Sequence, residues 1–476
     1  MKKIFLLFFI PIIALFLASC NGNENGDKIV ITYANWNLGS PDSEEPNMER
    51  LMLEAFQDKY PHIKVNVIEW PKEPGSNKNM DWPKFLLSRS SVQSLPDVYM
   101  GDDIPYYVIK DWAYNITDIA KADSEYLNIS EDIRSAATYN GKVMALPSAV
   151  FYAGYIVNKT LYDQQGQDWP TVTTTYQDFI SLTKAAANHT SATNNGVVGI
   201  DGIEHIIHWY PAQLNKNYGW FTLNDDGFNL DSDEFSQTMT EYRKLQTDIT
   251  FVYDALTHEA GKEGSTIDLD VIFPEGDQFA NGNVLAKFDY SWSFGYMQTN
   301  INNGTYTWNL DFIGTPVVNG NKRVPTVSDF FTIASNTKHP EEAYLLAKWM
   351  SFGKDGYLKR IELSKNISGI SQVNFAPLQN DKDLLDKYFE LYPSFISLRT
   401  IIEKGEFIVE PTKYLPGYIN SRYQGTYDAD RIMGKIIEEL RFGEVQFADI
   451  RTQLNTRINE IFREEKITFD NAIKDR

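Results

Sequence analysis

A strand, a helix and a second strand follow one another over residues 28–70, and this order constrains the fold most strongly. Residues 28–36, KIVITYANW, are rich in Val, Ile and Tyr and predict a buried strand. Residues 49–60 place apolar side chains at helical spacing, and Pro61 ends the helix. Residues 63–70, IKVNVIEW, predict the next strand. Because parallel strands need a crossover connection, this order predicts a βαβ unit and hence an α/β fold.

The chain begins with the pattern of an export signal. Lys2 and Lys3 precede an apolar run over residues 4–17. That run is too short to cross a bilayer comfortably, because a spanning helix needs about 20 apolar residues. It has the proportions of the apolar region of a signal peptide, which we expect to cover residues 1–19.

The sequence Leu17-Ala18-Ser19-Cys20 resembles the lipobox of bacterial lipoproteins, in which the cysteine thiol is acylated. Cys20 is the only cysteine in the chain, as expected for a thiol that carries lipid and pairs with no other cysteine. Residues 20–27 are polar and predict a flexible tether. We expect a lipid anchor on Cys20 to hold the protein at the extracellular face of the cytoplasmic membrane.

Length and charge limit what the mature chain can be. Of 476 residues, roughly 450 remain after the signal, which is too many for one small core and predicts two lobes. The net charge of −20 argues against nucleic acid as a partner, because proteins bind it through Lys and Arg. Aromatic residues make up 14% of the chain. A surplus of Trp and Tyr over the needs of the core is typical of a sugar-binding or cation-binding site.

Several segments together resemble the extracellular solute-binding proteins of bacterial ABC sugar importers, the maltose-binding-like class. The resemblance begins with ITYANW, FQDKYPHIKVNVIEW and LPDVYMGDD. It continues with NGKVMALPSAVFYAGYIVNKTLYD, DFISLTKAA and FANGNVLAKFDYSWSFGY. It is strongest over residues 313–351, IGTPVVNGNKRVPTVSDFFTIASNTKHPEEAYLLAKWMS. No single motif is diagnostic, but their order covers nearly the whole mature chain.

The resemblance implies a type II periplasmic-binding-protein-like fold: two α/β lobes, mainly parallel sheets flanked by helices, and hinge strands between the lobes. It implies an N-terminal lobe of residues 28–148 and 310–375. The C-terminal lobe then takes residues 149–309 and 376–476, with a helical tail. We expect helices near residues 431–442 and 447–462, and irregular structure between residues 392 and 427.

Candidate ligand-binding residues follow the predicted strands, because ligands of open α/β sheets bind beyond the carboxyl ends of the strands. Aromatic rings cover the flat C–H faces of a pyranose, and carboxylates or amides bond its hydroxyls. Residues of these types that follow or end the strands are Trp36, Asn37, Asp102, Asp103, Tyr152, Trp209, Asp289, Tyr290, Trp292, Asp329 and Phe330.

Most candidates also have a structural interpretation. Asp102 and Asp103 can cap the next helix, because Asp is a preferred N-cap residue. Trp36 and Trp209 can belong to the core, and Asp329 can hold a hinge strand. Trp292 is the strongest candidate for stacking on a sugar.

Signatures of catalysis and of cofactors are missing. The sequence has no glycine-lysine phosphate loop and no Gly-x-Ser-x-Gly, and its lone cysteine leaves no thiolate zinc site. We therefore expect a protein that is not an enzyme and has no cofactor or metal. The expected function is capture of a carbohydrate and its delivery to the permease subunits of an ABC transporter by hinge closure, by a monomer.

Three other functions stay open. An acidic and aromatic cleft can also bind a cationic solute such as a polyamine. Carboxylates are plentiful enough for a surface glycoside hydrolase, which needs two of them about 5–10 Å apart. A glycan-binding lipoprotein without a transporter is the remaining alternative.

Overall fold

The computed structural model describes residues 28–189, 194–367, 373–474 and 476. The predicted signal peptide, the tether and the acylation site Cys20 lie outside the described residues. Within the described part of the chain, no helix combines the length and the apolar character needed to cross a membrane.

The N-terminal lobe begins with the predicted βαβ unit. Strand β1 (Ile29–Ala34) leads through helix α1 (Met48–Lys59) to β2 (Ile63–Val67), and β1 pairs with β2 in parallel. Helix α2 (Trp82–Ser90) then leads to β3 (Val98–Gly101), which pairs with the other edge of β1. The predicted crossover order and parallel pairing are confirmed. The lobe continues with α3 (Ile104–Ile109), α4 (Thr117–Ala122), α5 (Ser124–Leu127), α6 (Glu131–Arg134), β4 (Thr138–Tyr139) and β5 (Lys142–Val143).

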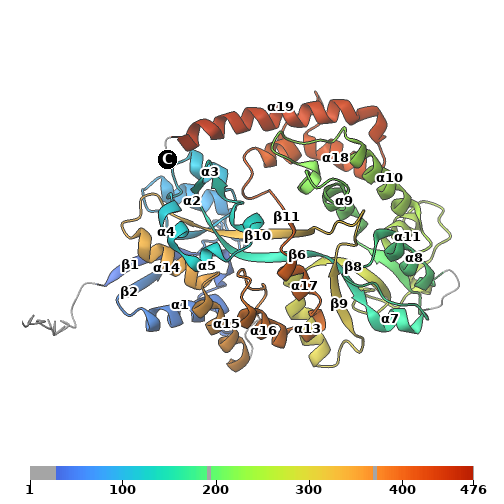
Figure 1. The fold of residues 1–476 in the computed structure, drawn as a ribbon, viewed down its shortest axis with the longest axis horizontal. Coiled ribbons are helices and arrows are strands. Elements are labelled where there is room, and N and C mark those ends of the chain that lie inside the picture. The colour runs from blue at the N-terminus through green and yellow to red at the C-terminus, as the bar shows by residue number, and fades with distance from the viewer. Residues whose placement is uncertain (1–27, 190–193, 368–372, 475) are drawn as a thin grey trace, which may run out of the picture.

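Two long strands connect the lobes across the middle of the molecule (Figure 1). Strand β6 (Leu146–Asn158) pairs with β10 (Val324–Ile333) up to Tyr152 and with β8 from Ala153 onward. All antiparallel pairs of the large sheet involve β6 or β10, whereas its other strand pairs are parallel. The sheet is therefore mixed, and the crossing strands make it so.

The C-terminal lobe builds on β7 (Val198–Asp201), β8 (Val284–Tyr290) and β9 (Leu310–Gly314). Its helices are α7 (Lys159–Gln164), α8 (Tyr176–Ala186), α9 (Ile206–Leu214), α10 (Asp233–Thr247), α11 (Tyr253–Ala260), α12 (Leu269–Ile272) and α13 (Phe294–Asn302). Close approach explains one glycine: a Cβ on Gly154 of β6 would lie 2.4 Å from the Gly314 Cα of β9.

The chain then returns to the N-terminal lobe and finishes with further helices. These elements are α14 (Pro340–Met350), α15 (Lys354–Asn366), α16 (Lys382–Leu391), α17 (Leu398–Lys404), β11 (Phe407–Val409), α18 (Met433–Phe442) and α19 (Phe447–Lys474). Helix α17 and strand β11 lie inside residues 392–427, so the prediction of irregular structure there was partly wrong. Strand β11 is three residues long, and its pairing with β10 is a long-range contact that local sequence does not reveal.

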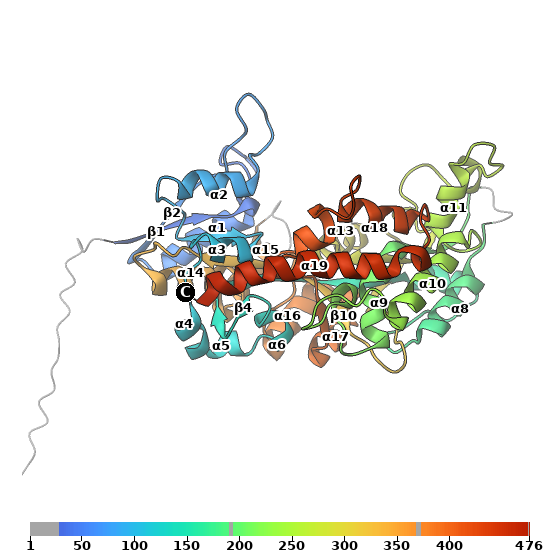
Figure 2. The same cartoon turned by 90° about the horizontal axis from the view of Figure 1, so that it is seen from above.

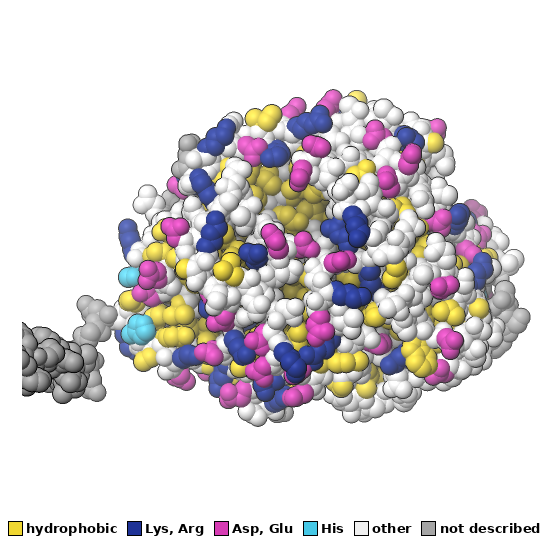
Figure 3. Space-filling view, in the orientation of Figure 1, with side chains coloured by type: hydrophobic (Ala, Val, Ile, Leu, Met, Phe, Trp, Pro, Cys, Tyr) yellow, Lys and Arg dark blue, Asp and Glu magenta, His cyan; other side chains and the backbone are white. Residues whose placement is uncertain are grey.

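Helix α19 is much longer than predicted and crosses both lobes (Figures 1 and 2). Near its middle, the Asn459 side chain bonds the backbone of Phe228 in the C-terminal lobe. Toward its end, the ring of Phe469 packs on Tyr139 of the N-terminal lobe at 4.7 Å. Figure 3 shows the surface of the molecule from the same side as Figure 1. Acidic and basic side chains are interspersed over it, and hydrophobic side chains gather in a recess.

Two hydrophobic clusters form the core. One contains β1 to β3, β10 and the first half of β6, and it extends to α13, α16 and α17. The other contains Ala153, Tyr155 and Val157 of β6, with α9, α10 and α18. The first cluster also includes Val198 of β7, Val284 of β8 and Phe312 of β9, so it runs from the N-terminal lobe into the C-terminal lobe. The lobe boundaries given above stay a prediction.

Candidate functional site

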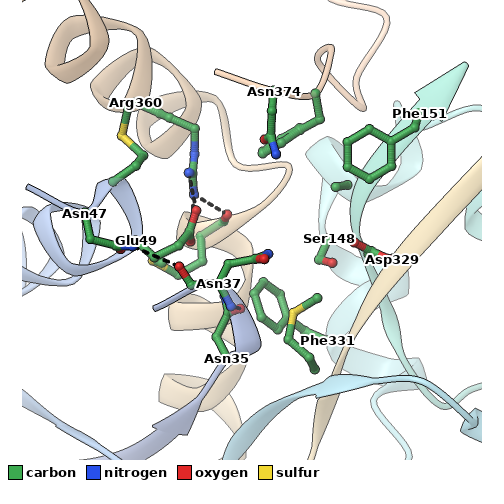
Figure 4. A pocket seen from close by; sticks show the side chains of 15 residues that line it. Asn35, Asn37, Asn47, Glu49, Ser148, Phe151, Asp329, Phe331, Arg360 and Asn374 are labelled. Atoms are coloured by element: carbon green, nitrogen blue, oxygen red, sulfur yellow. Dashed lines mark hydrogen bonds and ion pairs between the residues drawn. The ribbon is translucent and has the colours of Figure 1, made fainter. Parts of the chain in front are cut away.

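A cavity of about 210 Å³ lies at the carboxyl end of β1, beside the crossing strands (Figure 4). We call it the hinge cavity. In Figure 4, Asn37 lies on one side of it, and Ser148 and Asp329 of the crossing strands lie on the other. The residues that line it are Asn35, Asn37, Asn47, Met48, Glu49, Met100, Ser148, Ala149, Phe151, Asp329, Phe331, Met350, Arg360, Asn374 and Phe375.

Two asparagine side chains hold the peptide of Asn37 in place. Asn35 caps the short 3₁₀ helix η1 (Trp36–Leu38), and its side-chain oxygen accepts a hydrogen bond from Asn37 N at 2.8 Å. Asn47 caps α1, and its Nδ2 donates to Asn37 O at 3.0 Å. Asn is favoured at both N-caps because its oxygen bonds free backbone N–H groups. The exposed side chain of Asn37 is therefore presented from a fixed backbone.

Glu49 and Arg360 form a buried ion pair in the lining of the cavity. Glu49, in the first turn of α1, receives bonds from both terminal nitrogens of Arg360 of α15. Arg360 is 3% exposed and also donates to Met350 O. A buried guanidinium needs such partners, because an uncompensated charge in the interior is strongly unfavourable.

The crossing strands contribute a carboxylate and a free hydroxyl. Asp329 of β10 forms an ion pair with Lys413, which lies in the segment that follows β11. The Oγ of Ser148 on β6 is buried and has no hydrogen-bond partner among the described residues. Buried polar groups are normally satisfied, so this hydroxyl favours a polar occupant of the cavity.

Aromatic rings from the C-terminal lobe meet the cavity at Phe151. Trp292 packs edge-to-face on Phe151 at 5.4 Å and stacks on Tyr290 at 4.1 Å. Trp292 is 45% exposed although it is held by both rings. Burial, followed by the nearby carboxylate of Glu410, raises the pKa of Tyr290 to about 12, so this phenol is a neutral donor at physiological pH.

A second hollow of about 370 Å³ lies between α3, residues 412–424 and α19. We call it the α19 hollow. Asp102 and Asp103 line it, and Asp103 caps α3 by accepting from Tyr106 N at 3.1 Å. Burial, opposed by that hydrogen bond and helped by Asp102 and Glu465, raises the pKa of Asp103 to about 6.

The structure separates the candidates that the sequence suggested. Asn37 and Asp329 line the hinge cavity, and Trp292 and Tyr290 lie beside it through Phe151. Trp36 is half-buried and packs edge-to-face on Trp82, as the core interpretation allowed. Asp289 accepts from Tyr290 N and lies 3.9 Å from the Lys287 Nζ, and it does not line the cavity.

Three other candidates are buried and do not line the hinge cavity. Tyr152 packs on Phe407, and Phe330 packs on Tyr414. Trp209 is fully buried against Tyr210 in the C-terminal core. A ring without exposed surface has none to offer a ligand, so we leave these three out of the proposed site.

Several lining residues were not suggested by the sequence. Asn35 and Asn47 each precede a helix, so an N-cap pattern was present for both. Glu49 and Arg360 meet from residues more than three hundred positions apart, and no local pattern reveals such a pair. Among the described residues, no group of three or more His, Cys, Asp or Glu is arranged to hold a metal ion.

The sequence profile described as bacterial extracellular solute-binding protein matches residues 52–384. No sequence among curated proteins matches the chain significantly.

Solved structures match its fold. A substrate-binding protein of an ABC transporter from Listeria monocytogenes, in complex with cycloalternan, aligns with a TM-score of 0.62 at 18% identity over 92% of this chain and 99% of that one. A sugar transporter from Rhizobium etli in an open conformation gives 0.66 at 13% identity over 90% and 99%. The cyclic α-maltosyl-1,6-maltose-binding protein from Arthrobacter globiformis gives 0.61 at 13% identity over 92% and 100%. The chain therefore belongs to the bacterial extracellular solute-binding proteins, with their two-lobed fold.

Proposed function

We propose that this protein captures a carbohydrate, an oligosaccharide, in the hinge cavity and delivers it to an ABC permease. The observation that carries the proposal is the pairing of an amide on a fixed backbone and a carboxylate, which line the cavity, with an exposed indole that lies beside it on Phe151. Asn37 and Asp329 can bond hydroxyls, and Trp292 can cover the C–H face of a sugar ring. Similar folds whose structures name sugars as ligands support this choice.

Hinge closure is the proposed mechanism of capture. The partners of β6 change between Tyr152 and Ala153, so a bend at this point changes the angle between the lobes. Ligand favours the closed form only through contacts that the open form lacks. The polar residues of one lobe and the rings of the other supply such contacts when they meet on one sugar.

A thermal-shift screen against neutral oligosaccharides and polyamines tests the ligand class, because a ligand that binds only the folded state raises its stability. We expect a neutral oligosaccharide to stabilise the protein, with an affinity by calorimetry that changes little with salt. Stabilisation by polyamines alone, with an affinity that falls steeply as salt rises, would replace the carbohydrate by a cation. That second ligand is favoured by the carboxylates of Asp102 and Asp103 in the α19 hollow.

Two further measurements test capture without chemistry. Small-angle scattering should show a more compact molecule when the stabilising sugar is added. An assay for new reducing ends should show none after long incubation with the same sugar. Release of reducing ends with an unchanged scattering profile would favour a glycoside hydrolase instead.

The mature protein is proposed to be held at the membrane by a lipid anchor. We infer an acylated Cys20 at the extracellular face of the cytoplasmic membrane from the lipobox at residues 17–20. Metabolic labelling with a fatty acid should label the protein, and Cys20→Ala should abolish the label and release the protein from the membrane fraction. Labelling that survives the substitution would place the lipid elsewhere.

A further inference from the structure

A third hollow, distinct from the hinge cavity and the α19 hollow, lies at the outer end of the C-terminal lobe. Its volume is about 370 Å³, and it is formed by α7 and the segments that precede β8 and β9. Strand β8 runs from this hollow toward Tyr290, beside Trp292. At about 3.3 Å per residue, the two ends of the strand lie roughly 20 Å apart. This outer hollow is therefore separate from the hinge cavity.

Side-chain amides dominate the outer hollow. Among the residues that the structure describes, no charged one lines it, although charged residues make up 23% of the chain. Thr160, Thr307 and Trp308 are among the other lining residues. The amide-bearing residues are Asn158, Gln164, Gln165, Asn195, Asn281 and Asn283.

Part of this lining is held rigidly. Asn158 caps α7 by accepting from Leu161 N at 3.0 Å. The Nδ2 of Asn283 donates to Gln278 Oε1 at 3.1 Å. Trp308 stacks on Tyr306 at 4.7 Å. These contacts fix the walls of the hollow before any ligand enters.

Other polar groups of the lining have no partner. The side-chain amides of Gln164, Gln165 and Asn195 form no hydrogen bond to another described residue. The indole Nε1–H of Trp308 is buried and finds no acceptor in the described part of the chain. An amide offers both an acceptor oxygen and two N–H donors, and each hydroxyl of a sugar needs both kinds of partner.

We propose that the outer hollow is a second carbohydrate-binding site, for a neutral sugar or oligosaccharide. Free amides match hydroxyl groups, and a lining without charge offers no counter-ion to an anionic or cationic ligand. Gln164 and Gln165 at the end of α7 supply the hydrogen bonds, and Trp308 supplies an aromatic part of the same lining. The inference stands on this lining and does not require that the hinge cavity bind sugar.

Fluorine NMR of the protein labelled with fluorotryptophan can follow both sites at once. The signals of Trp308 and Trp292 are assigned with Trp308→Phe and Trp292→Phe. Mannotriose, maltotriose and cellotriose are then titrated to tens of millimolar, with glycerol as a control. We expect the Trp308 signal to shift saturably with at least one of these oligosaccharides and not with glycerol.

Substitution of two free glutamines in the lining is compared with substitution of a glutamine outside it. The double substitution Gln164→Ala and Gln165→Ala should weaken the titration seen at Trp308 by about fivefold or more, because the lost bonds are made only with ligand. Gln177→Ala, an exposed glutamine on α8 outside the lining, should leave it unchanged.

Three results would overturn the inference. The Trp308 signal could fail to shift with any oligosaccharide, it could shift equally with glycerol, or the double substitution could leave the affinity measured at Trp308 unchanged. A Trp308 signal that responds while the Trp292 signal stays fixed supports the second site and counts against the proposed function of the hinge cavity.

Discussion

The two sides of the hinge cavity are built in different ways. On the N-terminal side, the polar wall consists of Asn37 and Glu49, and Asp329 of the crossing strand β10 lies across the cavity from Asn37. Caps hold the backbone of Asn37, and ion pairs hold the two carboxylates. On the C-terminal side, the aromatic wall consists of Phe151, Tyr290 and Trp292, which are held by ring contacts. Hydrogen bonds fix the directions of the carboxylates and of the Asn37 backbone, whereas stacked rings fix a plane and tolerate sliding within it.

This difference suggests that one wall determines the specificity for the ligand and the other contributes affinity. A polar wall with fixed directions discriminates among hydroxyl patterns, because a misplaced hydroxyl leaves buried groups unpaired. An aromatic wall contributes affinity to many sugars, since nearly every pyranose offers a C–H face. The comparison makes four predictions, which separate stability from binding on each wall.

The largest effect should come from breaking the ion pair beneath the polar wall. Glu49→Ala leaves the buried guanidinium of Arg360 without its carboxylate. Removal of one partner of a buried pair costs about 3–5 kcal/mol of folding stability. Urea unfolding measures the loss. Glu54→Ala, on the exposed face of the same helix, is the control and should change the unfolding free energy by less than about 0.5 kcal/mol. Equal losses in the two variants would contradict the role given to the pair.

The next effect should appear in binding, on the aromatic wall. Trp292→Ala removes a half-exposed ring, so we expect a loss of about 1–3 kcal/mol in sugar affinity. Calorimetry with the sugar found in the thermal-shift screen measures it. Trp169, which is 40% exposed and lies in the segment between α7 and α8, is the matched control, since Trp292 packs on the cavity residue Phe151. An affinity unchanged by Trp292→Ala, or lowered equally by Trp169→Ala, would remove the ring from the site.

Residues on both sides of the cavity were predictable from the sequence. Tyr290 ends strand β8 and Trp292 follows it, and this local pattern suffices to nominate them. Asn37 and Asp329 were nominated for the same reason, because each lies in or directly after a strand. Polar or aromatic residues at strand ends are visible in sequence, and the carboxyl end of a parallel strand is where ligands bind.

Burial and long-range partners account for what sequence did not predict. Trp209 belongs to a helix that is almost wholly buried, and only the packing of α10 and η3 (Trp220–Thr222) around it shows this. The lobe-crossing length of α19 depends on contacts with both lobes, as does β11 on its pairing with β10. The βαβ start and the parallel pairing were predictable, because apolar periodicity records which face of each element is buried.

Asp103 extends the comparison to a polar residue of the N-terminal lobe that lies outside the hinge cavity, in the α19 hollow. Its folded-state pKa of about 6 lies above the usual value of 3.8, so the fold favours the protonated form. Stability from this group is complete below pH 3.8 and is lost as the pH rises through about 6. Asp103→Asn keeps the helix cap but cannot ionise. We expect the variant to gain about 1–2 kcal/mol relative to the natural protein between pH 4 and pH 7.5, after a discount for partial exposure. Unfolding free energies that run parallel over this range would contradict the assignment.

The smallest effect should come from the side chain of Asn37. Its backbone is held by Asn35 and Asn47, while its own amide forms no hydrogen bond with a described residue. Asn37→Ala should therefore leave the unfolding free energy unchanged and lower sugar affinity by about 0.5–1.5 kcal/mol, the net value of one hydrogen bond. Asn47→Ala is the informative partner, because it removes the cap and the bond to Asn37 O and so lowers stability as well. If Asn37→Ala destabilised the protein as much as Asn47→Ala, the amide would be part of the scaffold, and the polar wall would lose a group that the fold leaves free for a ligand.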